Sequence, residues 1–216
     1  MEKIPVKFQC QKWAWEHKPD EKTLERIESA GRTCYKSEDK ITKSSSEAFV
    51  RSLLKSGHLS VIEHSFASVR IITSRAVANE LVRHRLASFS QESTRYVNYR
   101  NKGFEIIYPE WIARYVVSEP NGKDIAFGRL RIWSRAMEQD VEAYLDLLDF
   151  GLRPEDARGV LPLDLKTELV VSANLREWRH IFKLRLSPGA HPQMKQLIGG
   201  MLPAFQKVIP VLFDDI

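Results

Sequence analysis

The chain of 216 residues contains only two cysteines, Cys10 and Cys34, and no Cys-x-x-Cys pair. Two isolated cysteines exclude the disulfide framework that stabilises small secreted proteins. The first residues contain no uncharged apolar run as long as that of a signal peptide. No stretch approaches the roughly 20 apolar residues that a membrane-spanning helix needs. These absences predict a reduced, cytoplasmic protein with no membrane contact.

Several common motifs of catalysis and nucleotide binding are also missing. The sequence has no Gly-x-Gly-x-x-Gly, no Walker A loop and no Gly-x-Ser-x-Gly, which argues against standard dinucleotide, P-loop and serine-hydrolase sites. The segment 57–64 contains His58, Glu63 and His64. A His-x5-His spacing alone is weak for a metal, and a polar turn with a capping or buried histidine is the better interpretation. We therefore predict no metal site.

The charge balance is only modestly basic, with 33 Lys and Arg against 28 Asp and Glu. This suits an anionic ligand, but no Lys/Arg block and no aromatic nucleic-acid motif is present. Nucleic-acid binding is therefore the weaker alternative, and it would show as binding that falls steeply with salt. The hydrophobic share of 43% is ordinary for a globular protein, so we expect one compact domain over residues 1–216.

Strands and long helices follow one another without a regular β-α-β alternation, which predicts an α+β fold. Gly31, Gly57 and Gly151 are the expected helix ends, and Pro203 is expected to kink or break the last helix. Arg179 and Lys183 are expected on a solvated helix face. Strands are predicted at 5–9, 65–73 and 167–173, and helices at 21–31, 47–56, 74–85, 125–150, 175–186 and 194–209.

The most informative segment is 83–96, Arg-His-Arg-Leu-Ala-Ser-Phe-Ser-Gln-Glu-Ser-Thr-Arg-Tyr. The planar fork of arginine binds phosphate and carboxylate with two parallel hydrogen bonds. Neighbouring hydroxyl and amide groups can read the polar edge of a ring, so the segment predicts a site for an anionic ligand such as a nucleotide. The alternative is that Arg83, His84 and Arg85 only complement the dipole of a helix that ends there. In a regular helix these three side chains point about 100° apart, so they would not all face one ligand.

The same segment resembles the signature of the flavin-dependent thymidylate synthases, Arg-His-Arg-x-x-Ser-x-Asn-Glu-x-Ser-x-Arg-Tyr. It departs from this signature at Ser90 and Gln91, which replace Asn and Glu. An amide offers donors that a carboxylate lacks, so the contact made at Gln91 is open. The matching positions are Arg83, His84, Arg85, Ser88, Ser93, Arg95 and Tyr96.

Three further segments resemble the same family. Residues 57–64 are similar to its Gly-His-x-Thr/Ser-x-x-Glu-His element, and residues 30–35 to its N-terminal region. Residues 158–185 are similar to an Arg, a Leu-Pro, an Asn-x-Arg and a Leu-Arg at the family's spacing. In this last segment the matching residues are Arg158, Leu161, Pro162, Asn174, Arg176, His180, Leu184 and Arg185.

The resemblance implies a single α+β domain with a mixed sheet and long helices, which forms a homotetramer with shared active sites. It also implies the reductive methylation of dUMP to dTMP, with methylenetetrahydrofolate as carbon donor and NADPH as reductant through FAD. Two competitors remain open: an enzyme with the same scaffold that places another one-carbon group on a pyrimidine nucleotide, and the nucleic-acid-binding protein considered above.

The resemblance also implies roles for individual residues. Arg185 is the expected catalytic group, because a guanidinium near the uracil ring stabilises negative charge on it. Binding of the nucleotide is expected at Glu80, Arg83, Gln91, Glu92, Ser93, Arg95, Arg158 and Arg185. Binding of the flavin is expected at Ser60, Arg83, His84, Arg85, Gln91, Asn174, Arg176 and His180.

Overall fold

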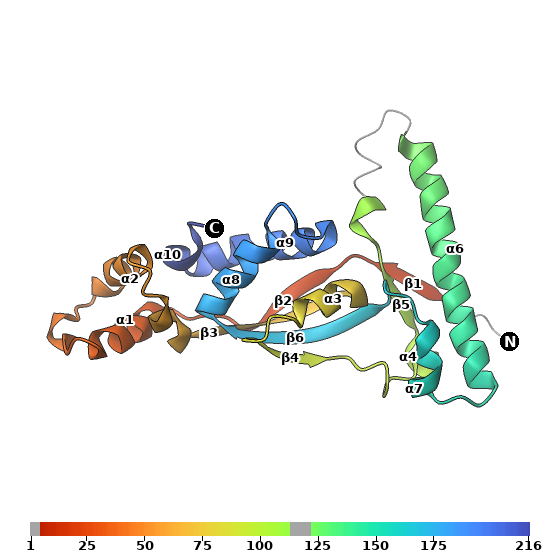
Figure 1. Ribbon diagram of the computed structural model, residues 1–216, viewed down its shortest axis with the longest axis horizontal. Coiled ribbons are helices and arrows are strands. Elements are labelled where there is room, and N and C mark those ends of the chain that lie inside the picture. The colour runs from red at the N-terminus through yellow and green to blue at the C-terminus, as the bar shows by residue number, and fades with distance from the viewer. Residues whose placement is uncertain (1–4, 113–121) are drawn as a thin grey trace. The chain divides into compact units, whose positions relative to one another are not determined.

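The computed structural model describes the backbone of residues 5–112 and 122–216, and the side chains of all of these except 122–126 (Figure 1). Contacts divide the chain into two compact units. Unit 1 takes its described residues from the ranges 5–12, 71–83 and 90–169, and unit 2 consists of residues 13–70, 84–89 and 170–216. None of the described helices is both long and apolar enough to cross a membrane.

Four strands form one sheet in the order β2-β3-β6-β4, and the boundary between the units falls within these strands. Strands β3 and β6 run antiparallel, because the Arg75 N–H donates to the Leu165 carbonyl at one end and the Leu175 N–H to the Ser65 carbonyl at the other. Alternate residues of β6 are buried, as a period of two requires. The four strands are β2 (Lys12–His17), β3 (Phe66–Ser74), β4 (Ser88–Gln91) and β6 (Lys166–Asn174).

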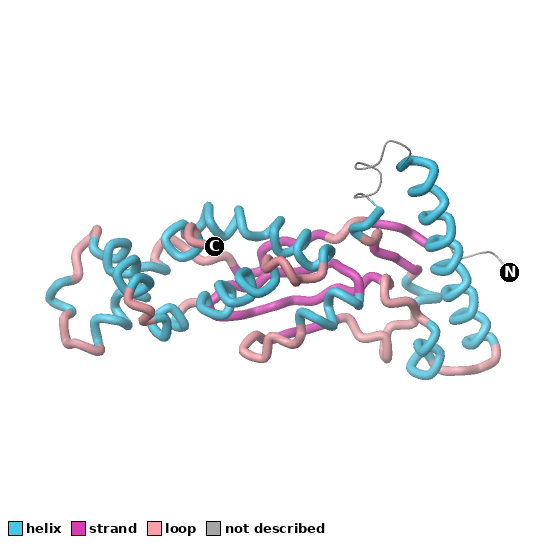
Figure 2. Tube along the Cα trace, turned by 45° about the horizontal axis from the view of Figure 1, so that its top comes forward, coloured by secondary structure: helices cyan, strands magenta, loops and turns pink. Residues whose placement is uncertain are grey.

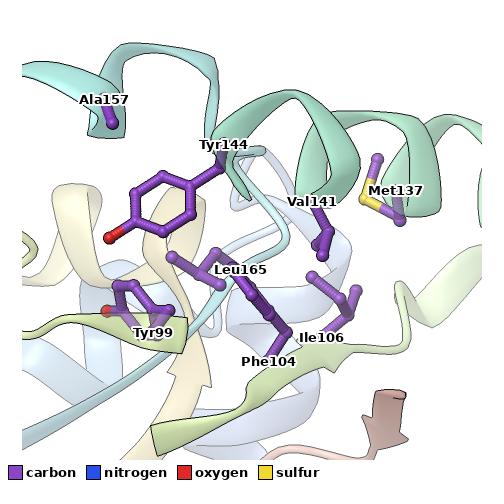
Figure 3. Packing of buried hydrophobic residues seen from close by; sticks show 8 residues of the cluster. All are labelled: Tyr99, Phe104, Ile106, Met137, Val141, Tyr144, Ala157 and Leu165. Atoms are coloured by element: carbon purple, nitrogen blue, oxygen red, sulfur yellow. The ribbon is translucent and has the colours of Figure 1, made fainter. Parts of the chain in front are cut away.

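Unit 1 also contains a two-stranded parallel sheet of β1 and β5, in which Val6 lies opposite Phe104. Its long helix α6 places Met137, Val141 and Tyr144 in one core cluster with Phe104 and Ile106 of β5, and the three α6 side chains lie at helical spacing on one face (Figure 3). The elements of unit 1 are β1 (Val6–Gln9), α3 (Arg75–Leu81), α4 (Tyr99–Lys102), β5 (Phe104–Ile107), α6 (Gly122–Asp149), α7 (Pro154–Ala157) and the 3-10 turn η3 (Arg158–Val160).

Unit 2 is mainly helical, and Figure 2 shows the helices in cyan. Its core is aromatic: Phe205 of α9 has its ring centroid 5.1 Å from that of Trp178 and 4.9 Å from that of Phe182, both in α8. The helices are α1 (Thr23–Thr33), α2 (Ser45–Lys55), α8 (Leu175–Arg185), α9 (Pro192–Val208) and α10 (Pro210–Phe213), with 3-10 turns η1 (Glu38–Lys40) and η2 (Leu59–His64).

The α+β class predicted from the sequence is confirmed, and so is the position of most elements. Gly57 and Gly151 follow α2 and α6 with φ of +71° and +88°, the left-handed conformation that glycine tolerates. Strands β2 and β5 were not predicted. The single-domain organisation stays a prediction.

Two local predictions were wrong, those for Gly31 and Arg179, and of the kink or break predicted at Pro203 the break was wrong. Gly31 does not end α1 but lies inside it, where a Cβ would come within 2.7 Å of the Phe49 ring, so close packing accounts for this glycine. Pro203 does not break α9, because the buried face of that helix stabilises it across the missing hydrogen bond. Arg179 is not solvated: it is buried and makes two hydrogen bonds of 2.6 Å to the Asp215 carboxylate.

Candidate active site

Helix α8 of unit 2 begins with a side-chain cap that fixes its first turn. The Asn174 side chain accepts a hydrogen bond of 2.8 Å from the backbone N–H of Glu177, and this satisfies one of the free N–H groups of the helix start. Arg176 is exposed and donates to Glu63 of η2 at 2.6 Å. Ser60 is exposed on the same turn. These predicted flavin residues therefore belong to two adjoining elements of unit 2.

His84 is buried between two charged residues of α8. Its Nδ1 lies 3.0 Å from the Glu177 carboxylate, and its Nε2 lies 3.0 Å from Nε of Arg185. The Nε–H of arginine can only donate, so Nε2 is the acceptor and Nδ1 carries the proton that faces Glu177. Burial lowers the pKa of His84, the neighbouring Arg185 and His180 lower it further, and Glu177 opposes this shift. His84 is therefore neutral near pH 7.

His84, Glu177 and the exposed His180 each offer one ligand atom within 4.8 Å of the others, close enough to hold a metal ion. The histidine rings have centroids 5.7 Å apart. The Arg185 guanidinium is bonded to His84, and its positive charge opposes a cation at this place. The group is better suited to an anionic ligand, and the prediction of no metal site is left untested.

The Arg-His-Arg triplet is not helical. Helix α3 ends at Leu81, so the triplet follows it in an irregular segment and the 100° argument does not apply. Arg83 and Arg85 are exposed while His84 is buried. Arg83 closes a segment of unit 1, in which Glu80 is half-buried on α3.

Glu92 of unit 1 is bound within the protein, although it was predicted to contact the nucleotide. Its carboxylate accepts from the Tyr99 hydroxyl at 3.0 Å and from Nζ of Lys166 at 2.9 Å. Gln91 donates to the Thr167 hydroxyl at 3.2 Å. Burial by itself lowers the pKa of Lys166, but Glu92, with Glu105 and Glu168, raises it overall. Lys166 therefore stays charged.

Arg95 and Arg158 lie around one carboxylate of unit 1, that of Glu155 at the start of α7. Arg95 donates to Glu155 at 2.9 Å, and Arg153 lies 2.8 Å from it. Arg95 lowers the pKa of Glu155, and Arg153 and Arg158 lower it further. Next to this cluster, the Arg158 guanidinium donates to the Thr94 hydroxyl at 3.4 Å.

The structure thus brings together some predicted site residues. His84, His180 and Arg185 meet in unit 2, and Arg95 and Arg158 meet in unit 1. The Ser93 hydroxyl accepts from the backbone N–H of Arg95 at 3.3 Å and so stabilises the turn.

The sequence reasoning missed Glu177, Arg153 and Lys166. The Asn-x-x-Glu spacing of 174–177 was a readable signal for the first, since it is typical of a helix start.

Comparisons with known proteins identify the family of the chain. The pattern of the family described as "Thymidylate synthase complementing protein" matches residues 17–211. A flavin-dependent thymidylate synthase of Geobacter sulfurreducens is 35% identical over 207 residues, which cover 93% of this chain and 84% of the relative. One from Corynebacterium aurimucosum is 35% identical over 205 residues, 88% of this chain and 78% of the relative.

A solved structure is also similar to the chain over most of its length. It is the UMP/dUMP methylase PolB from Streptomyces cacaoi bound with 5-Br dUMP, with a TM-score of 0.80, 25% identity, and coverage of 96% of this chain and 95% of PolB. The chain therefore belongs to the family of the thymidylate synthase complementing proteins, the flavin-dependent thymidylate synthases, and is an enzyme of the methyltransferase class.

Proposed function

We propose that the protein methylates dUMP to dTMP in the cytoplasm, with methylenetetrahydrofolate as carbon donor and NADPH as reductant through FAD. The observation that carries the proposal is the fixed position of Arg185, whose Nε is bonded to the buried His84. A guanidinium held in this way supplies a preorganised positive charge to a developing anion. We assign Arg185 to the activation of the uracil ring.

The arginines of unit 1 suit the phosphate of the nucleotide. Arg95 and Arg158 lie with Arg153 around Glu155, so three guanidinium groups already gather around one anionic group. We assign Arg83, Arg95 and Arg158 to the phosphate, and Glu80, Gln91 and Ser93 to the rest of the nucleotide. Glu92 completes the set of nucleotide residues, and its carboxylate is held by hydrogen bonds from Lys166 and Tyr99.

The polar groups of unit 2 suit a flavin dinucleotide, because cations and hydroxyls match a diphosphate. Arg85, Arg176, His180 and Ser60 are all exposed. When bound, FAD supplies the reducing equivalents. We assign the flavin to the unit 2 residues Ser60, His84, Arg85, Asn174, Arg176 and His180. The family resemblance adds Arg83 and Gln91, which belong to unit 1.

We also propose a homotetramer in which one active site takes residues from more than one subunit. Helix α6 supports association, because Phe127 and Ile132 leave 67% and 71% of their surfaces exposed on it. A fully active monomer in sedimentation analysis would contradict this part of the proposal.

Methylation of UMP is a second candidate activity. The similar structure of PolB is named as a methylase of both UMP and dUMP. Gln91 stands where the family signature has Glu and donates its amide to Thr167, so the contacts next to the nucleotide differ from those of the usual signature.

The test is the mass of the nucleotide product. The protein is incubated with FAD, NADPH, methylenetetrahydrofolate and either dUMP or UMP, with Arg185→Ala as control. We expect dTMP, which is one CH₂ group heavier than dUMP, and we expect it to be lost in the control and without FAD. A methylated UMP would establish the second activity, and no product from either nucleotide would overturn the proposal.

A further inference from the structure

We propose that Glu177 is a positioning residue for Arg185 and acts through His84, so that the three form one hydrogen-bonded chain. The inference rests on the proposed function of Arg185. It concerns a carboxylate to which our assignment gives no contact with the substrate or the flavin.

The geometry gives this series of hydrogen bonds a direction. Glu177 Oε1 lies 3.0 Å from His84 Nδ1, and Arg185 Nε donates to His84 Nε2 at 3.0 Å. A neutral imidazole has one N–H and one acceptor nitrogen. Because Arg185 requires the acceptor at Nε2, Glu177 receives the Nδ1 proton and fixes both the tautomer and the plane of the ring. The Arg185 bond to His84 is made by Nε.

Burial indicates that the charge of Glu177 has a use. The residue is only 5% exposed and His84 is also only 5% exposed. A buried carboxylate costs free energy unless charged or donor groups surround it, and an apolar residue at the same helix position would avoid that cost. The Asn174 cap needs only the backbone N–H of residue 177. Helix capping therefore does not explain the carboxylate, whereas orientation of His84 does.

The hydrogen bonds from Glu177 through His84 also predict how pH changes the contact that holds Arg185. Protonation of His84 puts a hydrogen on Nε2, which then faces the Arg185 N–H and can no longer accept from it. Among the described residues, three groups of α8 act on the pKa of His84: Glu177 favours the protonated form, and Arg185 and His180 oppose it. Removal of the Glu177 charge therefore makes His84 harder to protonate.

The experiment compares Glu177→Gln with wild type and with Glu47→Gln. Glu47 is the matched control because it is exposed and forms a surface ion pair with Arg51 at 3.0 Å. We expect kcat of Glu177→Gln to fall roughly tenfold to a hundredfold, as for a misplaced catalytic group, with KM for dUMP nearly unchanged. In a plot of kcat against pH, the fall of kcat on the acid side (the acid limb) should move to lower pH. Glu47→Gln should match wild type in both respects.

The outcomes separate the inference from the proposed function. If wild type makes no methylated nucleotide, the proposed function fails before any variant is compared. If Glu177→Gln has the maximal kcat and the acid limb of wild type, the inference is overturned and the proposed function stands. A lower plateau with an unmoved limb assigns Glu177 a merely structural role and also overturns it.

A second measurement covers a variant that does not fold. Nitrogen NMR of the histidines in the wild-type protein reports the tautomer of His84 without an activity assay. The His84 signal is assigned as the one that is missing from the spectrum of His84→Gln. A protonated Nδ1 and a bare Nε2 at neutral pH are expected. A proton on Nε2 would break the chain that we propose.

Discussion

The two units each hold a titratable base against carboxylates, yet the balance of charge is opposite. In unit 2, His84 meets one carboxylate, Glu177, and two opposing groups, Arg185 and His180. In unit 1, Lys166 lies 2.9 Å from Glu92, 3.9 Å from Glu105 and 3.7 Å from Glu168. Burial opposes the charged form in both places. The number of carboxylates and of opposing cations decides the direction in which each pKa moves.

The difference gives the two clusters opposite dependences on pH. The pKa of His84 is below its ordinary value of 6.5, so its neutral form stabilises the fold above that value and the contribution is lost as the pH falls. The pKa of Lys166 is above its ordinary value of 10.5, so its contribution is present below that value and is lost as the pH rises further. Near neutral pH only the His84 cluster is close to a change of state. That suits a catalytic network, while the Lys166 cluster suits a structural one.

The largest effect is expected from Arg185→Lys. Lysine keeps the charge but has a single ammonium group, which cannot bond His84 and present a planar fork at the same time. We expect kcat to fall roughly a hundredfold, about 2.7 kcal/mol in the barrier, while the unfolding midpoint in urea stays near that of wild type. Retention of most of the activity would mean that charge alone suffices and that the His84 contact is unimportant.

Lys166→Met should have the opposite effect to Arg185→Lys, with a larger loss of stability and a smaller loss of activity. Three carboxylates would lose their shared cation in a place where Lys166 and Glu92 are only 16% and 17% exposed. We expect the free energy of unfolding to fall by about 2 kcal/mol, with less loss of activity per folded molecule than Arg185→Lys gives. Lys183→Met is the control, since Lys183 is 56% exposed and 3.7 Å from Asp215, and should cost less than about 0.5 kcal/mol. Equal losses in the two variants would remove the distinction between the clusters.

The sequence predicted one of these clusters better than the other, for a physical reason. His84 and Arg185 belong to motifs with fixed spacing, so each could be identified from its own segment. Lys166 has no local signal: its partners Glu92 and Glu105 come from other elements, and only strand pairing and chain packing bring them together. The solvated helix face predicted for Arg179 was wrong for the same reason. Helical spacing does not show that Asp215, far from α8 in the sequence, accepts a hydrogen bond from Arg179.

The smallest effect, and the sharpest internal comparison, is expected from two tyrosines of the unit 1 core. Figure 3 shows Tyr99 and Tyr144 in the same apolar cluster, and both are nearly fully buried. The Tyr99 hydroxyl donates to Glu92, and burial together with Glu92 raises its pKa. The Tyr144 hydroxyl is buried and has no hydrogen-bond partner among the described residues. Burial raises the pKa of Tyr144, and the Tyr99 backbone partly opposes this rise.

Replacement by phenylalanine keeps the ring and removes one oxygen at either position. We expect Tyr99→Phe to lower the free energy of unfolding by about 1 kcal/mol, because Glu92 loses a donor that water does not replace. Tyr144→Phe should be neutral or slightly stabilising, since an unsatisfied buried hydroxyl is removed. Urea denaturation of both variants measures the difference. If Tyr144→Phe costs as much as Tyr99→Phe, the stability of this core depends on its hydroxyls in general, and the Lys166–Glu92 network has no special share in it.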